Sequence, residues 1–210
     1  MPSATILIAD ISGYTDFAGR AALHHSSYVL RELLDLIIES VRLDLTISEI
    51  EGDAILFYRL GDPILPEILL KQCERTFLGF HERLKVIERD RVCQCGACEK
   101  ASGLTLKFVI HYGQIEEITV SSFRKAVGID MIVAHRLLKN SLPVHDYILA
   151  SHAYRSASGV PRPISALRMD GVGRRISGHR PGLFRLRVAR RAEALRPARA
   201  SPTLLSHGRE

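Results

Sequence analysis

The most constraining feature of this sequence is a pair of apolar segments that flank a short acidic turn. Residues 43–50 (LDLTISEI) alternate between apolar and polar side chains, and residues 54–60 (AILFYRL) are almost continuously apolar. Alternation with a period of two is typical of a β-strand, and a Gly-Asp pair between two such segments is typical of a hairpin turn. We therefore expect a β-hairpin whose turn carries Glu51 and Asp53.

Strand-like and helix-like segments alternate along the rest of the chain. Residues 4–10 (ATILIAD) have the length of a buried strand, and residues 26–41 carry apolar side chains at helical spacing, with Ser26 or Ser27 as the expected N-cap. Further elements are expected as a helix over residues 64–88, two strands over 104–120 broken at Gly113, a helix over 128–141, and strands over 146–151 and 182–188. This order predicts an α+β, ferredoxin-like sandwich with helices packed on a mostly antiparallel sheet.

The charge of the chain is concentrated at its C-terminal end. At 210 residues with 46% hydrophobic side chains, the chain can form one domain with a core, which we place at residues 1–180. Most of the net charge of +6 belongs to a tail at residues 181–210, where six arginines and one acid lie between Arg185 and Arg199. No aromatic residues interleave these arginines, so we expect a solvated, partly disordered tail and no nucleic-acid partner.

Nothing in the sequence predicts a membrane segment. No apolar run approaches the roughly 18 residues that span a bilayer, and the N-terminus lacks the basic start of a signal peptide. The chain has four cysteines, which suits a reducing compartment. We therefore expect a cytoplasmic protein without a membrane partner.

Three of the four cysteines lie within a segment at about residues 89–103, which we interpret as an insertion. Cys93, Cys95 and Cys98 form a C-x-C-x-x-C pattern. Zinc normally takes four ligands, so a zinc site here needs a further group such as Cys73, His81 or a second chain. A structural zinc, a redox thiol cluster and surface cysteines without a ligand all remain open.

Two aspartates stand at the ends of predicted strands. Asp10 ends the strand at residues 4–10, and Asp53 lies at the turn of the hairpin, so antiparallel neighbours can bring the two carboxylates close together. Two such acids repel each other unless a cation neutralises them, and Mg²⁺ prefers oxygen ligands. The turn after Asp10 (Ser12, Gly13, Tyr14 and Thr15) offers consecutive backbone N–H groups for a phosphate. A metal–phosphate site and two structural turn aspartates both fit this pattern.

Four motifs carry a resemblance to a known family. ILIADISGYTDF, EIEGDAILFY, LKFVIHYGQI and VGIDMIVAHRL occur in the order and at about the spacing of the catalytic domain of class III nucleotidyl cyclases. The resemblance covers roughly residues 4–155. In its details the chain is most similar to an uncharacterised bacterial branch of that superfamily, a domain of unknown function.

The resemblance implies a metal-dependent reaction on a nucleotide. Asp10 and Asp53 would be the metal aspartates, with the backbone carbonyl of Ile11 as a further ligand. Two Mg²⁺ or Mn²⁺ ions would then activate the ribose 3′-hydroxyl of a nucleoside triphosphate and stabilise the pyrophosphate leaving group. The product would be a 3′,5′-cyclic nucleotide, formed at a homodimer interface.

Two positions depart from the family pattern. Arg136 matches the arginine that stabilises the transition state, and it also fits a helix-end cation on a solvated face. Ile132 stands where cyclases have an asparagine that orients the ribose. Glu49 matches the guanine-reading pattern, whereas Lys125 matches neither the guanine nor the adenine pattern. We therefore expect either guanine recognition or a Glu49–Lys125 ion pair that fills the base site. The chain is accordingly either an active cyclase or a catalytically degenerate nucleotide-binding or dimerisation module in signalling.

Two histidines lie near these motifs. His111 is on an apolar strand, and we interpret it as a core histidine whose ring nitrogens are hydrogen-bonded. His135 lies on the helix over residues 128–141, where we expect it to contact a partner chain.

Overall fold

The computed structural model describes most of the region expected to be the domain. It covers residues 1–19, 23–90, 101, 103–140 and 142–159, together with the backbone of residues 166–168 and 186–187. The Cys93, Cys95 and Cys98 cluster lies outside the described residues, as do the boundary at residue 180 and nearly all of the tail.

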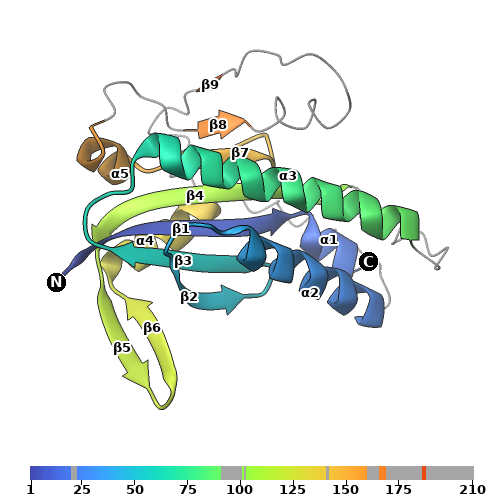
Figure 1. Cartoon of the computed structure of the whole chain (residues 1–210), viewed down its shortest axis with the longest axis horizontal. Helices are drawn as coiled ribbons and strands as arrows, with labels where there is room; N and C mark the ends of the chain where they lie inside the picture. The colour runs from blue at the N-terminus through green and yellow to red at the C-terminus, as the bar shows by residue number, and fades with distance from the viewer. Residues whose placement is uncertain are drawn as a thin grey trace, which may run out of the picture.

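A seven-stranded sheet forms the centre of the molecule (Figure 1). Its strand order is β2-β3-β1-β4-β7-β8-β9, and every neighbouring pair is antiparallel except β4 and β7. The strands are β1 (Ser3–Ser12), β2 (Thr46–Glu51), β3 (Ala54–Leu60), β4 (Thr105–Gln114), β7 (Tyr147–Ala150), β8 (Ala166–Arg168) and β9 (Leu186–Arg187). The predicted hairpin is β2 and β3, and the predicted α+β sandwich with a mostly antiparallel sheet is confirmed.

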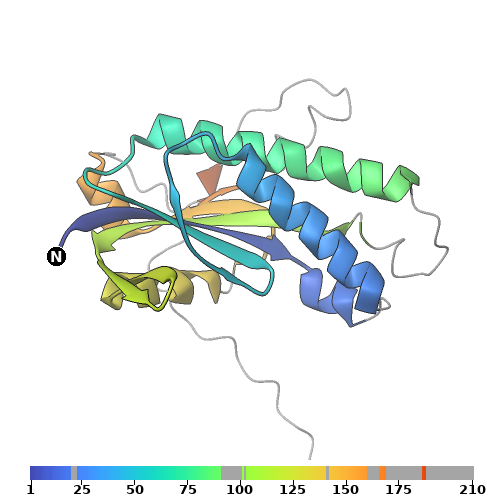
Figure 2. The same ribbon diagram turned by 60° about the horizontal axis from the view of Figure 1, so that its bottom comes forward.

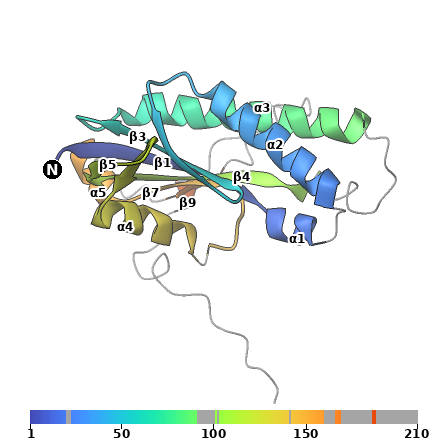
Figure 3. The same ribbon diagram turned by 90° about the horizontal axis from the view of Figure 1, so that it is seen from below.

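Helices cover both faces of this sheet. The long helices α2 (Leu23–Ser40) and α3 (Pro66–Asp90) lie on one face, and α4 (Ile129–Leu138) lies on the other (Figures 2 and 3). Two short helices, α1 (Tyr14–Ala18) and α5 (His152–Ala157), follow the ends of β1 and β7. Among the described residues, no helix is both long enough and apolar enough to cross a bilayer.

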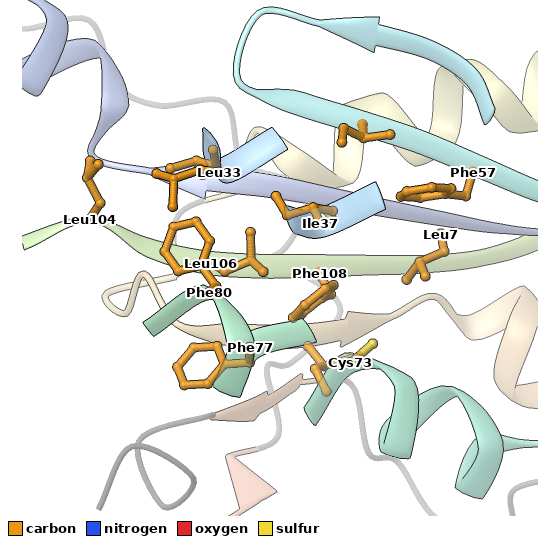
Figure 4. Close-up of a cluster of buried hydrophobic side chains, with 14 of the residues drawn as sticks. Leu7, Leu33, Ile37, Phe57, Cys73, Phe77, Phe80, Leu104, Leu106 and Phe108 are labelled. Atoms are coloured by element: carbon orange, nitrogen blue, oxygen red, sulfur yellow. The ribbon is translucent and has the colours of Figure 1, made fainter. Parts of the chain in front are cut away.

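The face under α2 and α3 carries the larger hydrophobic core (Figure 4). Alternate residues of β1, such as Leu7 and Ile11, point toward these helices and are almost completely buried. The helices contribute large side chains at helical spacing, among them Leu33, Phe77 and Phe80. The apolar periodicity of the two helical segments therefore predicts the face that they bury.

The opposite face of the sheet carries a second core beneath α4. The other residues of β1, including Ile6 and Ile8, pack there with Met131 and Ala134 of α4. Because both faces of β1 are covered, nearly all its residues are buried, which explains the continuous apolar run in the sequence.

The predicted N-cap of α2 was wrong. The helix begins at Leu23, and the hydroxyls of Ser26 and Ser27 donate to the Leu23 carbonyl at 3.0 and 2.7 Å. Serine can bond back to a carbonyl three or four residues earlier, so these residues lie inside the first turn rather than before it.

The predicted break at Gly113 was also wrong. β4 continues through Gly113 to Gln114, and the chain then enters β5 (Glu116–Val120). β5 pairs with β6 (Phe123–Val127) in a separate hairpin that projects from the sheet in Figure 1. A Cβ at position 113 would lie 2.1 Å from Cγ of Asp130, so the glycine is needed for close approach of α4 rather than for a strand break.

Candidate functional site

The predicted metal aspartates line one open pocket beside the end of α4. Asp10 lies on β1, directly opposite Ala54 of β3 and Lys107 of β4, and Asp53 lies in the β2–β3 turn. The N–H of Ile11 donates to the Asp53 carbonyl at 3.1 Å and fixes the turn against β1. The side chain of Ile11 is buried in the larger core, so only its backbone is available to a ligand. The pocket has a volume of about 490 Å³.

Both acidic and basic side chains line this pocket. The carboxylates are Asp10, Glu49, Glu51 and Asp53, and the basic groups are Lys107, Lys125, His135 and Lys139. The sequence motifs predicted most of the acids, but not the roles of Lys107, His135 and Lys139. Lys107 carried a usable signal, because it interrupts the apolar β4 at the position that faces Asp10.

The ionised form of Asp53 is disfavoured in this pocket. Partial burial and the neighbouring carboxylate of Asp10 raise the pKa of Asp53, and the more distant Lys107 offsets this only in part. Lys107 is committed to Asp10, with its Nζ 3.0 Å from the Asp10 Oδ1. A pair of carboxylates in this state attracts a further cation.

This donor set fits a hard divalent cation. Among the described residues, no cluster of three or more His, Cys, Asp or Glu side chains is arranged to hold a metal. Mg²⁺, however, is commonly held by one or two carboxylates and completes its shell with water and substrate phosphates. Asp10, Asp53 and a backbone carbonyl would therefore suffice in the presence of a phosphate ligand.

Glu49 is held from both sides. Lys125 Nζ lies 2.5 Å from its Oε2, and His135 Nε2 lies 3.2 Å from its Oε1. Burial alone would raise the pKa of Glu49, but the Lys125 ammonium and His135 together hold it below its usual value. The predicted Glu49–Lys125 ion pair is present, and His135 contacts its own chain, with Nδ1 3.6 Å from Glu51 Oε2.

Arg136 does not line the pocket of its own chain. It lies on the exposed surface of α4 together with Ile132, which is 47% exposed, and Ile129, which is 74% exposed. In the part of the chain that the structure describes, no ion pair involves Arg136. The side chain is therefore positioned toward solvent or a partner rather than toward Asp10.

The predicted phosphate turn lines a pocket of its own. Ser12, Gly13 and Thr15 border a space of about 380 Å³ beside the end of β1. The Ser12 hydroxyl donates to the His145 carbonyl at 2.9 Å, and the Tyr14 hydroxyl donates to the Ser26 carbonyl at 3.3 Å. Gly13 has a φ of 88°, which favours glycine and reverses the chain into α1. The hydroxyls of Ser12 and Tyr14 are thus engaged within the chain, and a ligand at this turn would meet backbone groups, Thr15 and the carboxylate of Asp16.

His111 is a buried core histidine, as predicted. Its Nε2 lies 2.9 Å from Asp130 Oδ1, and its Nδ1 lies 2.7 Å from Ser151 Oγ. A carboxylate can only accept, so Nε2 carries the hydrogen and a neutral ring accepts from Ser151 at Nδ1. Asp130 also accepts from the N–H of Gln114 at 2.7 Å, which fixes the start of α4 to β4.

The two proposed partners of the cysteine cluster lie in different environments. Cys73 is completely buried in the larger core, and burial raises the pKa of its thiol well above the usual range. His81 packs against Phe77 and Phe80, and its Nε2 lies 3.4 Å from Thr105 Oγ1. Cys73 is therefore not available to a metal at the surface.

Comparison with protein families matches residues 30–147 to "Protein of unknown function (DUF2652)". The chain belongs to this family. The matched region of the DUF2652 chain includes Glu49, Asp53, Lys125 and Arg136, whereas Asp10 precedes it. The chain is also similar to "Uncharacterized protein Rv2561/Rv2562" of Mycobacterium tuberculosis, with 32% identity over 122 residues. That match covers 57% of this chain and only 55% of the mycobacterial protein.

The fold of this DUF2652 chain is similar to those of solved structures. It superposes on the adenylyl cyclase CyaB from P. aeruginosa with a TM-score of 0.51 and 18% identity, over 74% of this chain and 80% of that one. A bacterial light-regulated adenylyl cyclase gives 0.54 and 13%, over 74% and 45% respectively. At these identities the likeness concerns the fold, which is that of the class III cyclase domains, as the motifs predicted.

Proposed function

We propose that this chain is a cyclase-like domain that binds a divalent cation and a nucleoside triphosphate in the pocket of Asp10 and Asp53. The observation that carries the proposal is that these two carboxylates, one on β1 and one in the β2–β3 turn, line the same open pocket. The pKa of Asp53 is raised mainly by burial and secondly by the carboxylate of Asp10, and a bound cation would neutralise this pair of acids.

Each predicted residue has a physical role in this proposal. Asp10, Asp53 and the Ile11 carbonyl would hold Mg²⁺ or Mn²⁺, which would supply charge stabilisation for the triphosphate and activation of the 3′-hydroxyl. Backbone N–H groups at Gly13 to Thr15 would position phosphate oxygens, since this turn directly follows β1, the strand that carries Asp10.

A homodimer is part of the same proposal. Arg136 is exposed and does not line the pocket of its own chain, so it would serve the pocket of a second copy, where guanidinium donors stabilise developing phosphate charge. The exposed side chains Ile129 and Ile132 on α4, with Val120 and Phe123 on the β5–β6 hairpin, support burial against such a copy.

A second candidate is a nucleotide-binding or dimerisation module that does not cyclise. Lys125 and His135 occupy both oxygens of Glu49, which leaves that carboxylate poorly placed to accept hydrogen bonds from guanine. Ile132 also cannot donate to the ribose. Loss of one preorganised donor commonly reduces the rate by about 10²–10³.

The distinguishing experiment is an incubation of the purified chain with Mn²⁺ or Mg²⁺ and GTP or ATP, with cyclic product measured by mass spectrometry. Asp10→Ala and Asp53→Ala are the test variants, and Asp44→Ala, which removes an exposed aspartate outside the pocket, is the matched control. Product from the wild type and the control, but not from the test variants, would establish the enzyme. No product from a dimeric protein that binds metal would exclude catalysis and leave the second candidate.

A further inference from the structure

Lys107 is held closely at the carboxylate expected to bind a metal. It lies directly opposite Asp10 in the β1–β4 ladder, and its Nζ is 3.0 Å from the Asp10 Oδ1. The two side chains are only 20% and 15% exposed. Its neighbours Leu106 and Phe108 are buried, so the backbone that carries Lys107 is held in place by the core.

The other basic groups of the pocket are directed elsewhere. Lys125 and His135 bind Glu49 and Glu51. Lys139 lines the pocket but makes no ion pair within the described residues, and it is exposed. Lys107 is thus the cation that faces Asp10 from the neighbouring strand.

We propose that Lys107 is a resident counter-ion that competes with a divalent cation for the Asp10 carboxylate. The inference rests on the proposed function, because it takes Asp10 as a metal ligand. An ammonium and a divalent ion that share one carboxylate repel each other at close range, so binding of the ion is opposed by an ammonium that stays in place and requires work to displace it. Lys107 therefore weakens the binding of a free metal ion. Once displaced, its ammonium is available to the anionic phosphates that arrive with the nucleotide.

The test is a titration of the purified full chain with Mn²⁺ alone, in which free Mn²⁺ is measured by electron paramagnetic resonance. Lys107→Met removes the ammonium and is expected to tighten Mn²⁺ binding roughly three- to tenfold, as for loss of one competing, partly buried ion pair. Lys139→Met removes a charge from the same pocket without freeing Asp10, and its affinity is expected to stay within about twofold of wild type. Lys107→Arg, which keeps the charge, is expected to bind like wild type.

Each outcome decides a separate point. Equal affinities of Lys107→Met and wild type would overturn the role of Lys107 and leave the metal site standing. Equal tightening by Lys139→Met would also overturn it, because the effect would then be one of overall charge. No saturable binding in any variant would overturn the metal site and this inference together. Circular dichroism would verify folding, and Lys107→Gln replaces Lys107→Met if that variant does not fold.

Discussion

The two faces of the central sheet differ in how completely they are covered. Helices α2 and α3, of 18 and 25 residues, cover one face with a continuous apolar core. Helix α4 has only 10 residues, and the charged pocket opens where it ends. The larger apolar core therefore lies on the face beneath α2 and α3, whereas the charged pocket lies on the other face, beside the end of α4.

Successive side chains of β1 point to opposite faces of the sheet. Ala9 and Ile11 of β1 belong to the larger core, whereas Asp10 between them faces the pocket. A buried strand holds the backbone of a site residue in a fixed position more precisely than a loop does. Substitutions on the two faces should therefore have separable effects.

The largest expected effect is on the covered face. Phe80→Ala would remove a completely buried ring from the core and should lower the free energy of unfolding by about 3–5 kcal/mol. The measurement is chemical denaturation with urea, and the Mn²⁺ affinity of the remaining folded protein should not change. Ile68→Ala, at a 43% exposed position, is the control and should stay within about 0.5 kcal/mol of wild type. Similar losses for both variants would show that the face is not packed as described.

The next effect concerns the attachment of α4 to the sheet. Gly113→Ala would force Asp130 away and break its hydrogen bonds to His111 and the Gln114 N–H. We expect a loss of about 1–3 kcal/mol in thermal or urea unfolding, because the buried ring of His111 would lose its carboxylate partner. Gly79→Ala on α3 is the matched control. Its Cβ would meet Leu36 only at 3.8 Å, so it should be neutral or stabilising. A neutral Gly113→Ala variant would contradict the described approach of α4.

The smallest effects distinguish two acids within the pocket. Glu49→Gln would weaken the contacts to Lys125 and His135, whereas Asp53→Asn would relieve repulsion by Asp10. Without metal, we expect the first substitution to lower and the second to raise the free energy of unfolding at pH 7, each by about 0.5–1 kcal/mol. Equal signs for the two variants would contradict the charge distribution of the pocket.

The pH dependence of these two effects has opposite signs. The pKa of Glu49 is lowered on folding, so its contribution is present above the ordinary value of 4.5 and is lost as the pH falls through the folded value. The pKa of Asp53 is raised from 3.8, so its ionisation costs stability as the pH rises from 3.8 through the folded value. Urea unfolding at pH 3–7 would measure both, and Asp53→Asn should remove the second trend.

Much of the fold could be predicted because it follows local periodicity. The β2–β3 hairpin and helices α2 and α3 each have a distinct apolar pattern, and such a pattern predicts both the type of element and the side that it buries. The short helices α1 and α5 and strand β6 were missed, since five or six residues give little periodic signal. Gly113 was misinterpreted because its role depends on Asp130, a contact that no local pattern contains.

The sequence motifs predicted the two aspartates of the site and the Glu49–Lys125 pair, but not the other basic residues that pair with its acids. Asp10 and Asp53 were predicted at the ends of apolar segments, and the structure places them in one pocket, although β1 continues past Asp10 to Ser12. The pairing of Lys107 with Asp10 depends on strand register, and that of His135 with Glu49 depends on where α4 packs. Such pairs join elements far apart in the chain, so neither follows from spacing alone.

The most direct test of the central claim is nucleotide binding without chemistry. Isothermal titration calorimetry with Mn²⁺ and 3′-deoxy-GTP or 3′-deoxy-ATP would measure binding of triphosphates that lack the attacking hydroxyl and so cannot cyclise. We predict saturable, metal-dependent binding to the wild type that weakens at least about tenfold in Asp10→Ala and in Asp53→Ala, as for loss of one charged metal ligand. Undiminished binding in both variants would contradict the claim that this acidic pocket is the nucleotide site.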